Sequence, residues 1–182
     1  MKIEKLDIPG SALVHACPRA DERGAFARWF CQDELSDCIG DRTIVNMNYS
    51  RTEDVGAVRG MHAQRSPALE MKLVRCTRGA VFDVIVDLRL GSPTFLHWRG
   101  ETLSAENMKM FVVPEGVAHG FQVLEPGSEM LYLHTAFYAP DAEVGVRFDD
   151  PKLAIGWPMP ATVVSERDRA HPLIDACFQG IS

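Results

Sequence analysis

Three basic side chains lie close to apolar, strand-like segments of the chain. Arg59 and His62 belong to the block Arg59-Gly60-Met61-His62, and Lys72 follows shortly after it. An uncompensated charge beside apolar residues is costly, so these side chains indicate a site that binds an anion or moves a proton. The alternative is a basic hairpin on the surface.

A second segment, Pro114-Glu115-Gly116-Val117-Ala118-His119-Gly120-Phe121, carries another histidine. The spacing Pro114-x-Gly116-x-x-His119 resembles the second motif of cupin jelly rolls, in which the glycine permits the turn and the histidine points into the barrel. A metal-binding cupin has more ligands on an earlier strand, but the segment around His62 offers one histidine, with Gln64 after it. Two histidines without a third ligand rarely make a catalytic metal site, so we expect no metal and no other cofactor.

The middle of the chain predicts the β-strands that position these residues. Apolar runs predict strands at 73–76, 80–88, 110–114, 120–124 and 130–134. Turn signals separate them, at Gly79, 91–93, 114–116 and 126–128, and we expect successive strands to pair antiparallel. This pattern is typical of an all-β barrel or sandwich.

Helical signals are confined to two short stretches near the ends of the chain. Asp33-Glu34-Leu35 predicts a single turn, and Ser165-Glu166-Arg167-Asp168 predicts a short helix capped at its N-terminus. The expected fold is therefore a β-barrel with small flanking helices.

Length and composition exclude several classes of protein. A chain of 182 residues fits one domain, residues 1–182, and its net charge of −6 disfavours nucleic acid as a partner. No apolar run is long enough to span a bilayer, so we expect no membrane insertion. The five cysteines have no CxxC spacing and the first residues form no apolar signal segment, which indicates a cytoplasmic protein.

Short motifs occur in order along nearly the whole chain. They are Asp21-Glu22-Arg23-Gly24-x-Phe26, Asn48-x-Ser50, Arg59-Gly60-Met61-His62-x-Gln64, Lys72-Leu73-Val74, Gly79 to Val84, Asp87-Leu88-Arg89, Ser92 to Phe95, Leu103-Ser104, Asn107, Pro114 to Phe121, Tyr132, Tyr138-x-Pro140, Asp149-Asp150-Pro151 and Ile155-x-Trp157-Pro158. This set resembles the dTDP-4-dehydrorhamnose 3,5-epimerase family, a metal-free cupin-type group that acts on nucleotide-linked 4-keto-6-deoxysugars. The resemblance implies a cupin-like jelly-roll barrel.

The resemblance also implies catalytic roles for four residues. Inversion of a carbon beside a ketone needs a base on one face, an acid on the other and stabilisation of the enolate between them. His62 matches the family's general base and Asp168 the carboxylate that orients it. Lys72 matches the donor to the sugar C4 oxygen, and Tyr132 matches the acid on the opposite face.

Further residues match substrate-binding positions of the family. Arg59 and Arg23 fit a diphosphate, because a guanidinium grips two phosphate oxygens, although each is also consistent with an exposed charge at the barrel rim. Phe26 and Tyr138 fit the nucleotide base, and His119 fits a contact to the sugar. Asn48 lies within a family motif. The family pairs its barrels, which implies a homodimer that lends Arg23 and Phe26 across the interface.

The chain departs from the family pattern at several positions. Arg28 replaces a common Glu suited to the N3 hydrogen of thymine, whereas cytosine N3 prefers a donor such as arginine. Asn46 replaces a common Gln, Ala63 replaces a bulky residue and Ala136 replaces an Asp. These changes leave open an enzyme that inverts only C3 or only C5, or one that acts on a CDP or GDP sugar.

Other functions and some pairings also stay open at this point. The competing classes are a metal-dependent cupin oxygenase or isomerase and a non-catalytic cupin that binds sugar nucleotides. Asp83 lies in an apolar strand and is expected to pair with His62 or His119. The remaining histidines, His15, His97, His134 and His171, match no role in the family. An epimerase of this kind would serve a surface polysaccharide or a glycosylated natural product.

Overall fold

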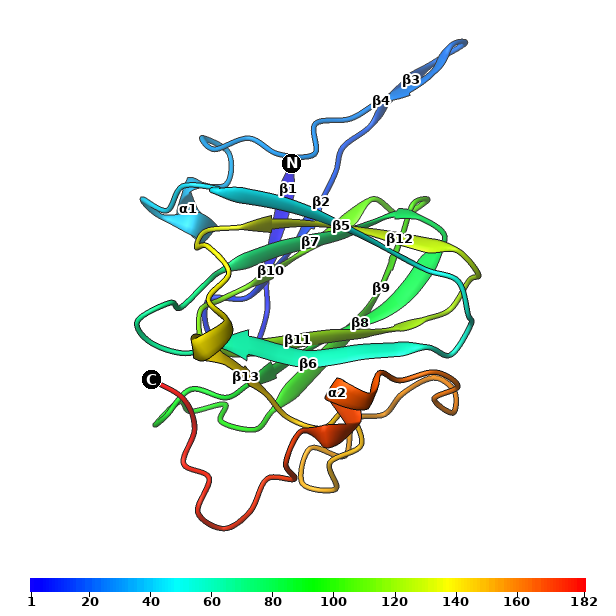
Figure 1. Ribbon diagram of the computed structural model, residues 1–182. Helices are drawn as coiled ribbons and strands as arrows, with labels where there is room; N and C mark the ends of the chain where they lie inside the picture. The colour runs from blue at the N-terminus through cyan, green and yellow to red at the C-terminus, as the bar shows by residue number, and fades with distance from the viewer.

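The computed structural model describes residues 1–182 and consists of two antiparallel sheets packed face to face (Figure 1). The first sheet has the strand order β1-β2-β10-β7-β12-β5 and the second has the order β13-β6-β11-β8-β9. The strands of the two sheets are β1 (Lys2–Lys5), β2 (Ala12–His15), β5 (Asn46–Thr52), β6 (Val58–Gln64), β7 (Lys72–Arg78), β8 (Ala80–Asp87), β9 (Trp98–Ser104), β10 (Lys109–Val113), β11 (Val117–Val123), β12 (Ser128–His134) and β13 (Glu143–Gly145). The predicted jelly-roll β-barrel is confirmed.

The inner faces of both sheets are apolar at one end of the barrel and polar at the other. Side chains alternate between the faces of a strand, so Val81 and Ile85 of β8 enter the central core with Val74 of β7 and Phe121 of β11. By the same alternation Asp83 points inward between Val81 and Ile85, and it is completely buried. Polar residues on inward positions of several strands therefore converge inside the barrel.

Two further apolar clusters cover the outer faces of the sheets. Leu35 and Ile39, at the helix α1 (Ser36–Ile39), pack on the first sheet. The segment that follows β13 covers the second sheet, where Val146, Leu153 and Ile174 are buried. The same segment carries α2 (Glu166–Ala170), which lies beneath β6 in Figure 1. This covering layer brings the C-terminal part of the chain to the strand that holds His62.

The predicted strands all correspond to strands of the structure, with small shifts at their ends. The predicted turn at Asp33–Leu35 immediately precedes α1, and Ser165 caps α2 by accepting a hydrogen bond from the backbone of Asp168. The expectation that successive strands pair is wrong for most of this region. The turn at Gly79 carries the chain from β7 in the first sheet to β8 in the second, so β7 pairs with β10 and β12 instead.

A small hairpin projects from the first sheet. It consists of β3 (Arg19–Asp21) and β4 (Gly24–Phe26), which pair only with each other, and Figure 1 shows it extending away from the barrel. A single 3-10 turn, η1 (Pro140–Ala142), precedes β13. Neither helix reaches the length or apolar character that a membrane crossing requires.

Candidate active site

A cavity of about 610 Å³ opens between the two sheets at the polar end of the barrel. Inward-facing side chains of β5, β6, β7, β11 and β12 line it, together with residues of α2 and the segment before it. Four predicted residues from four different elements meet here: His62, Lys72, Tyr132 and Asp168. The second sheet and α2 supply His62 and Asp168, and the first sheet supplies Lys72 and Tyr132.

His62 and Asp168 form a hydrogen-bonded pair at the mouth of the cavity. His62 Nε2 lies 2.8 Å from Asp168 Oδ1, and the backbone N–H of Gly60 donates to Oδ2 at 3.0 Å. Burial opposes ionisation of Asp168, but the hydrogen bonds from His62 and Gly60 hold the pKa of this carboxyl below its usual range. An ionised Asp168 accepts the Nε2 proton of His62, so Nδ1 is the ring nitrogen free to take a proton.

Tyr132 lies on the opposite wall of the cavity. Its hydroxyl lies 2.9 Å from Ser50 Oγ on the neighbouring strand β5, and its ring contacts His119 edge to face. Burial raises the pKa of Tyr132 well above its usual value, while the Ser50 hydroxyl opposes the rise. The phenol is therefore protonated over the whole physiological pH range and is able to donate.

Lys72 lines the cavity and is held by the carboxylate of Glu70. Its Nζ lies 2.9 Å from Glu70 Oε1, and Glu70 Oε2 lies 2.9 Å from Nδ1 of His134. Burial opposes the ionisation of Glu70, yet its hydrogen bond with His134 and the charge of Lys72 keep its pKa below the usual range. The lysine Nζ also lies 3.4 Å from the carbonyl oxygen of His62, which places an ammonium donor next to the histidine.

His119 forms a second histidine–carboxylate pair deeper in the barrel. Its Nε2 lies 2.8 Å from Asp83 Oδ2, and both side chains are buried. Of the two partners considered for Asp83, the structure therefore selects His119. Burial raises the pKa of Asp83, and His119 only partly offsets this effect.

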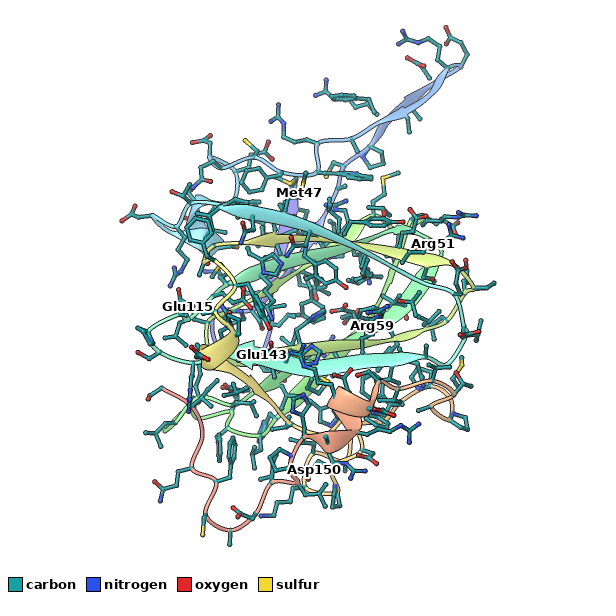
Figure 2. All side chains as sticks on the ribbon, viewed as in Figure 1. Met47, Arg51, Arg59, Glu115, Glu143 and Asp150 are labelled. Atoms are coloured by element: carbon teal, nitrogen blue, oxygen red, sulfur yellow. The ribbon has the colours of Figure 1, made fainter.

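The predicted binding residues fall into two groups. Arg59 lines the main cavity, Asn46 and Tyr138 line an adjoining cavity of about 240 Å³, and Asn48 lines both. Arg59 reaches from β6 across to the first sheet, where its Nε donates to Thr52 Oγ1 at 2.9 Å (Figure 2).

Arg23, Phe26 and Arg28 lie outside both cavities of their own chain. Arg23 pairs with Asp21 within the projecting hairpin, and Arg28 pairs with Glu34. The Phe26 side chain is 76% exposed at the end of β4. The chain alone does not bring these three residues to the site.

Several residues at or beside the cavities had no assigned role in the sequence. Arg167 lines both cavities and forms an ion pair with Glu143. Its position next to Asp168 in the sequence is the signal that could have assigned it to the site. Glu70 is separated from Lys72 by one residue, the spacing of two side chains on the same face of a strand. His171 lies beside the His62 ring, where burial and the charge of His62 lower its pKa.

Comparisons with known proteins identify the family to which the chain is similar. The model of the dTDP-4-dehydrorhamnose 3,5-epimerase family matches residues 5–176. A dTDP-4-dehydrorhamnose 3,5-epimerase from Pseudomonas aeruginosa is 44% identical over 171 residues, 93% of each chain. The crystal structure of dTDP-6-deoxy-D-glucose-3,5-epimerase from Legionella pneumophila, in complex with dTDP-4-keto-L-rhamnose, has a TM-score of 0.90 at 38% identity and covers 100% of this chain and 98% of that chain.

A relative with a narrower activity is similar as well. A 3'-monoepimerase from Streptomyces bikiniensis, solved in complex with dTDP-quinovose, has a TM-score of 0.88 at 32% identity and covers 93% of this chain and 86% of that chain. The family model extends over the hairpin, both sheets and α2. The chain therefore belongs to the dTDP-4-dehydrorhamnose 3,5-epimerase family.

Proposed function

We propose that the protein is an epimerase that inverts C3, C5 or both carbons of a nucleotide-linked 4-keto-6-deoxyhexose. The observation that carries this proposal is the placement of His62 and Tyr132 on opposite sheets across one cavity. A base on one face of the sugar ring and an acid on the other is what inversion beside a ketone requires. The carbon loses its proton on one side and regains one on the other.

His62 acts as the base through Nδ1. The hydrogen bond from Nε2 to Asp168 fixes the tautomer, so that the free lone pair lies on Nδ1, and the carboxylate stabilises the imidazolium formed when the proton arrives. Gly60 and the capped first turn of α2 hold Asp168 in place.

Lys72 and Tyr132 complete the reaction. As the proton leaves, negative charge develops on the C4 oxygen, and the ammonium of Lys72 stabilises it in a cavity where a charged donor is worth several kcal/mol. Tyr132 then donates its proton to the carbon from the opposite face. Its raised pKa keeps the phenol protonated until the enolate is present.

The nucleotide end of the substrate extends toward Arg59, whose guanidinium suits a diphosphate.

A second copy of the chain contributes Arg23 and Phe26 in a homodimer. The support is that the hairpin projects away from its own barrel, and that Met47 and Tyr49 on edge strand β5 are 68% and 59% exposed. Arg28 lies just beyond this hairpin, and the support for a role in base selection is chemical: a guanidinium donates only, and so suits a base with an acceptor at N3. All five cysteines are free, which fits a reducing cytoplasm. The product would serve a surface polysaccharide or a glycosylated natural product.

The test is NMR detection of solvent deuterium at C3 and C5 of dTDP-4-keto-6-deoxyglucose incubated with the purified protein. Exchange at both carbons supports a 3,5-epimerase, and exchange at one carbon supports a monofunctional enzyme. A parallel incubation with the CDP analogue tests the role of Arg28.

The control is His62→Ala, which must bind the nucleotide sugar with little change while losing exchange. Binding without exchange by the unaltered protein would instead favour a sugar-nucleotide-binding cupin. Absence of both binding and exchange with either nucleotide would contradict the proposed substrates.

A further inference from the structure

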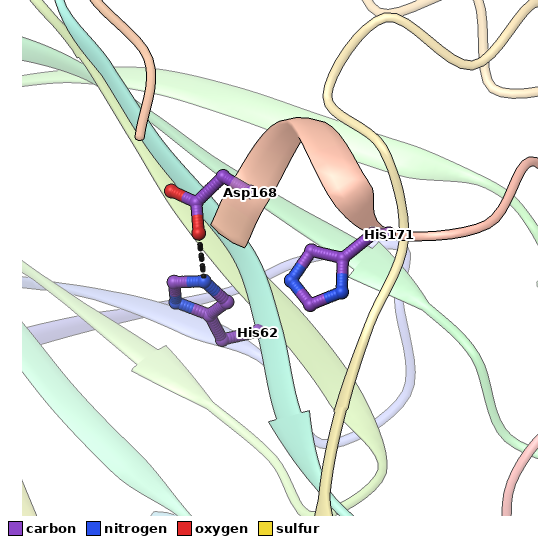
Figure 3. A group of neighbouring side chains, drawn as sticks. All are labelled: His62, Asp168 and His171. Atoms are coloured by element: carbon purple, nitrogen blue, oxygen red, sulfur yellow. Dashed lines mark hydrogen bonds and ion pairs between the residues drawn. The ribbon is translucent and has the colours of Figure 1, made fainter. Parts of the chain in front are cut away.

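A third side chain, His171, lies beside the His62–Asp168 pair (Figure 3). It follows α2 directly, and its ring meets that of His62 edge to face with 5.7 Å between the centroids. A Cβ at Gly145, the strand partner of His62 on β13, would lie 2.3 Å from atoms of the His171 ring. Only glycine leaves this space, so the imidazole is closely fitted into a slot next to the pair.

The Nε2 atom of His171 is buried and has no hydrogen-bond partner in the protein. A buried polar nitrogen without a partner is costly, and such groups are rare in folded proteins. Figure 3 shows one ring nitrogen of His171 turned toward His62. One ligand atom from each of His62, Asp168 and His171 lies within 4.8 Å of the other two. An unused nitrogen thus faces two groups that also bind cations.

We infer that His62, Asp168 and His171 form an inhibitory site for a divalent transition-metal ion, for which Zn²⁺ is the best match. Two imidazole nitrogens and a carboxylate oxygen are ligands that zinc accepts, with water in the fourth position. Donor atoms on a tetrahedral zinc lie about 3.3 Å apart. The three ligand atoms lie within 4.8 Å of one another, so the widest separation has to shrink by at most about 1.5 Å when the ion binds.

The surroundings of the three ligands suit this ion. The N–H of Gly60 already holds Oδ2 of Asp168, and this contact leaves Oδ1 to the metal while it fixes the carboxylate. The helix cap at Ser165 holds the backbone of the same residue. Arg167, the neighbouring cation that acts on His171, is neutralised by its ion pair with Glu143.

The inhibitory effect rests on the proposed function, whereas the metal site rests on the geometry alone. Zinc on His62 Nε2 would occupy the lone pair of that nitrogen, so a neutral imidazole would have to carry its proton on Nδ1. This is the atom that must accept the substrate's proton. Lys72, Tyr132 and Arg59 are not ligands, so substrate binding persists. Zinc should therefore lower kcat and leave KM nearly unchanged.

The metal site is tested by calorimetric titration of the EDTA-treated full chain with Zn²⁺. We expect one site per chain, weakened about tenfold or more in His171→Ala and in His171→Phe, which retains an aromatic ring without nitrogen. His97→Ala is the matched control, because His97 is exposed and its side chain has no hydrogen bond; its affinity should be unchanged. Circular dichroism verifies that each variant is folded. A lack of stoichiometric binding by the parent, or binding by both His171 variants as tight as that of the parent, would overturn the site.

Two further measurements distinguish this site from a cysteine site and from competition with the substrate. The absorption spectrum of the Co²⁺-loaded protein should show tetrahedral bands without a thiolate charge-transfer band, and a thiolate band would assign the ion to a cysteine and overturn the inference. In the deuterium-exchange assay, Zn²⁺ should suppress turnover of the parent reversibly with EDTA, but only weakly in His171→Ala. A rise in KM alone would contradict inhibition at Nε2. If the protein exchanges no substrate, the titration still decides the metal site.

Discussion

The barrel contains two histidine–carboxylate pairs with the same 2.8 Å separation and different surroundings. Asp168 has a second donor, the N–H of Gly60, and its pKa is lowered. Asp83 is completely buried, its Oδ1 has no hydrogen-bond partner, and its pKa is raised. The separation between the partners therefore does not decide what a pair does. The depth of burial, together with the number of donors around the carboxylate, decides how firmly it remains an anion.

The two pairs also differ in their access to the cavity. The His62 side chain is 31% exposed, and that of His119 is 6% exposed. His62 has a free nitrogen and an ionised partner, which are the properties of a base. His119 lines the cavity beside Tyr132, with their ring centroids 6.1 Å apart, so the His119–Asp83 pair supports the opposite wall of the site.

The largest expected effect is a difference in kcat between the variants Asp168→Asn and Asp83→Asn. In Asp168→Asn the amide oxygen is retained by the N–H of Gly60, so the amide NH2 faces His62 Nε2. His62 must then place its proton on Nδ1, which blocks the base, and kcat should fall by about 10³–10⁴-fold. Asp83→Asn should lower kcat by about tenfold at most, because Asp83 does not contact His62, the proposed base.

The measurement is kcat and KM for deuterium exchange, with nucleotide affinity as a control for folding. In Asp168→Asn the loss should lie in kcat, because the groups that bind the substrate are unchanged. Equal losses in the two variants would remove the distinction between a catalytic pair and a supporting pair.

Tyr132→Phe tests the cavity wall that the His119–Asp83 pair supports. Its expected effect on the rate of inversion is smaller. Without the hydroxyl, His62 still removes the proton and returns it or a solvent deuteron to the same face, so exchange continues while inversion slows by about 10²-fold. Ser50→Ala is the matched control, because it removes the partner of the hydroxyl and leaves the acid in place. The measurement is the ratio of deuterium incorporation to formation of the inverted sugar. A parallel loss of both would assign Tyr132 to substrate binding.

The sequence predicted the His62–Asp168 pair better than the residues around it. His62, Lys72, Tyr132 and Asp168 were identified because short motifs surround most of them, and Ser165 indicated the helix that carries Asp168. Pairing between strands was predicted poorly, since turns such as that at Gly79 lead from one sheet to the other and local signals do not show which sheet the next strand joins.

Other features depend on contacts between distant segments. Strand β5 was not predicted, because its inward positions carry polar residues such as Asn48 and Ser50 rather than apolar ones. The contacts of Glu70 with His134 and of His171 with His62 join residues that are far apart in the chain. Only the folded barrel brings them together.

The smallest expected effect concerns stability, and it uses two carboxylates of the same strand. Asp87 is buried like Asp83, but Arg89, Ser92 and Thr94 all donate to it. Burial opposes its ionisation, yet these donors lower the pKa of Asp87 from 3.8 to about 2. Asp87 therefore contributes about 2 kcal/mol at neutral pH, and this contribution is lost as the pH falls from about 4 toward 2. Asp83 has a raised pKa, so the folded state binds its proton more tightly than the unfolded state does. Ionisation of Asp83 therefore lowers the free energy of unfolding as the pH rises above the usual carboxyl range.

Urea unfolding of Asp87→Asn and Asp83→Asn between acid and neutral pH checks this contrast. Relative to the parent, Asp87→Asn should be destabilised by about 2 kcal/mol at pH 7 and by less at acid pH. For Asp83→Asn, the free energy of unfolding relative to the parent should instead increase as the pH rises. If the two free-energy profiles run parallel, the missing donor at Asp83 Oδ1 is not what distinguishes the His119–Asp83 pair, and its difference from the His62–Asp168 pair must be sought in access to the cavity alone.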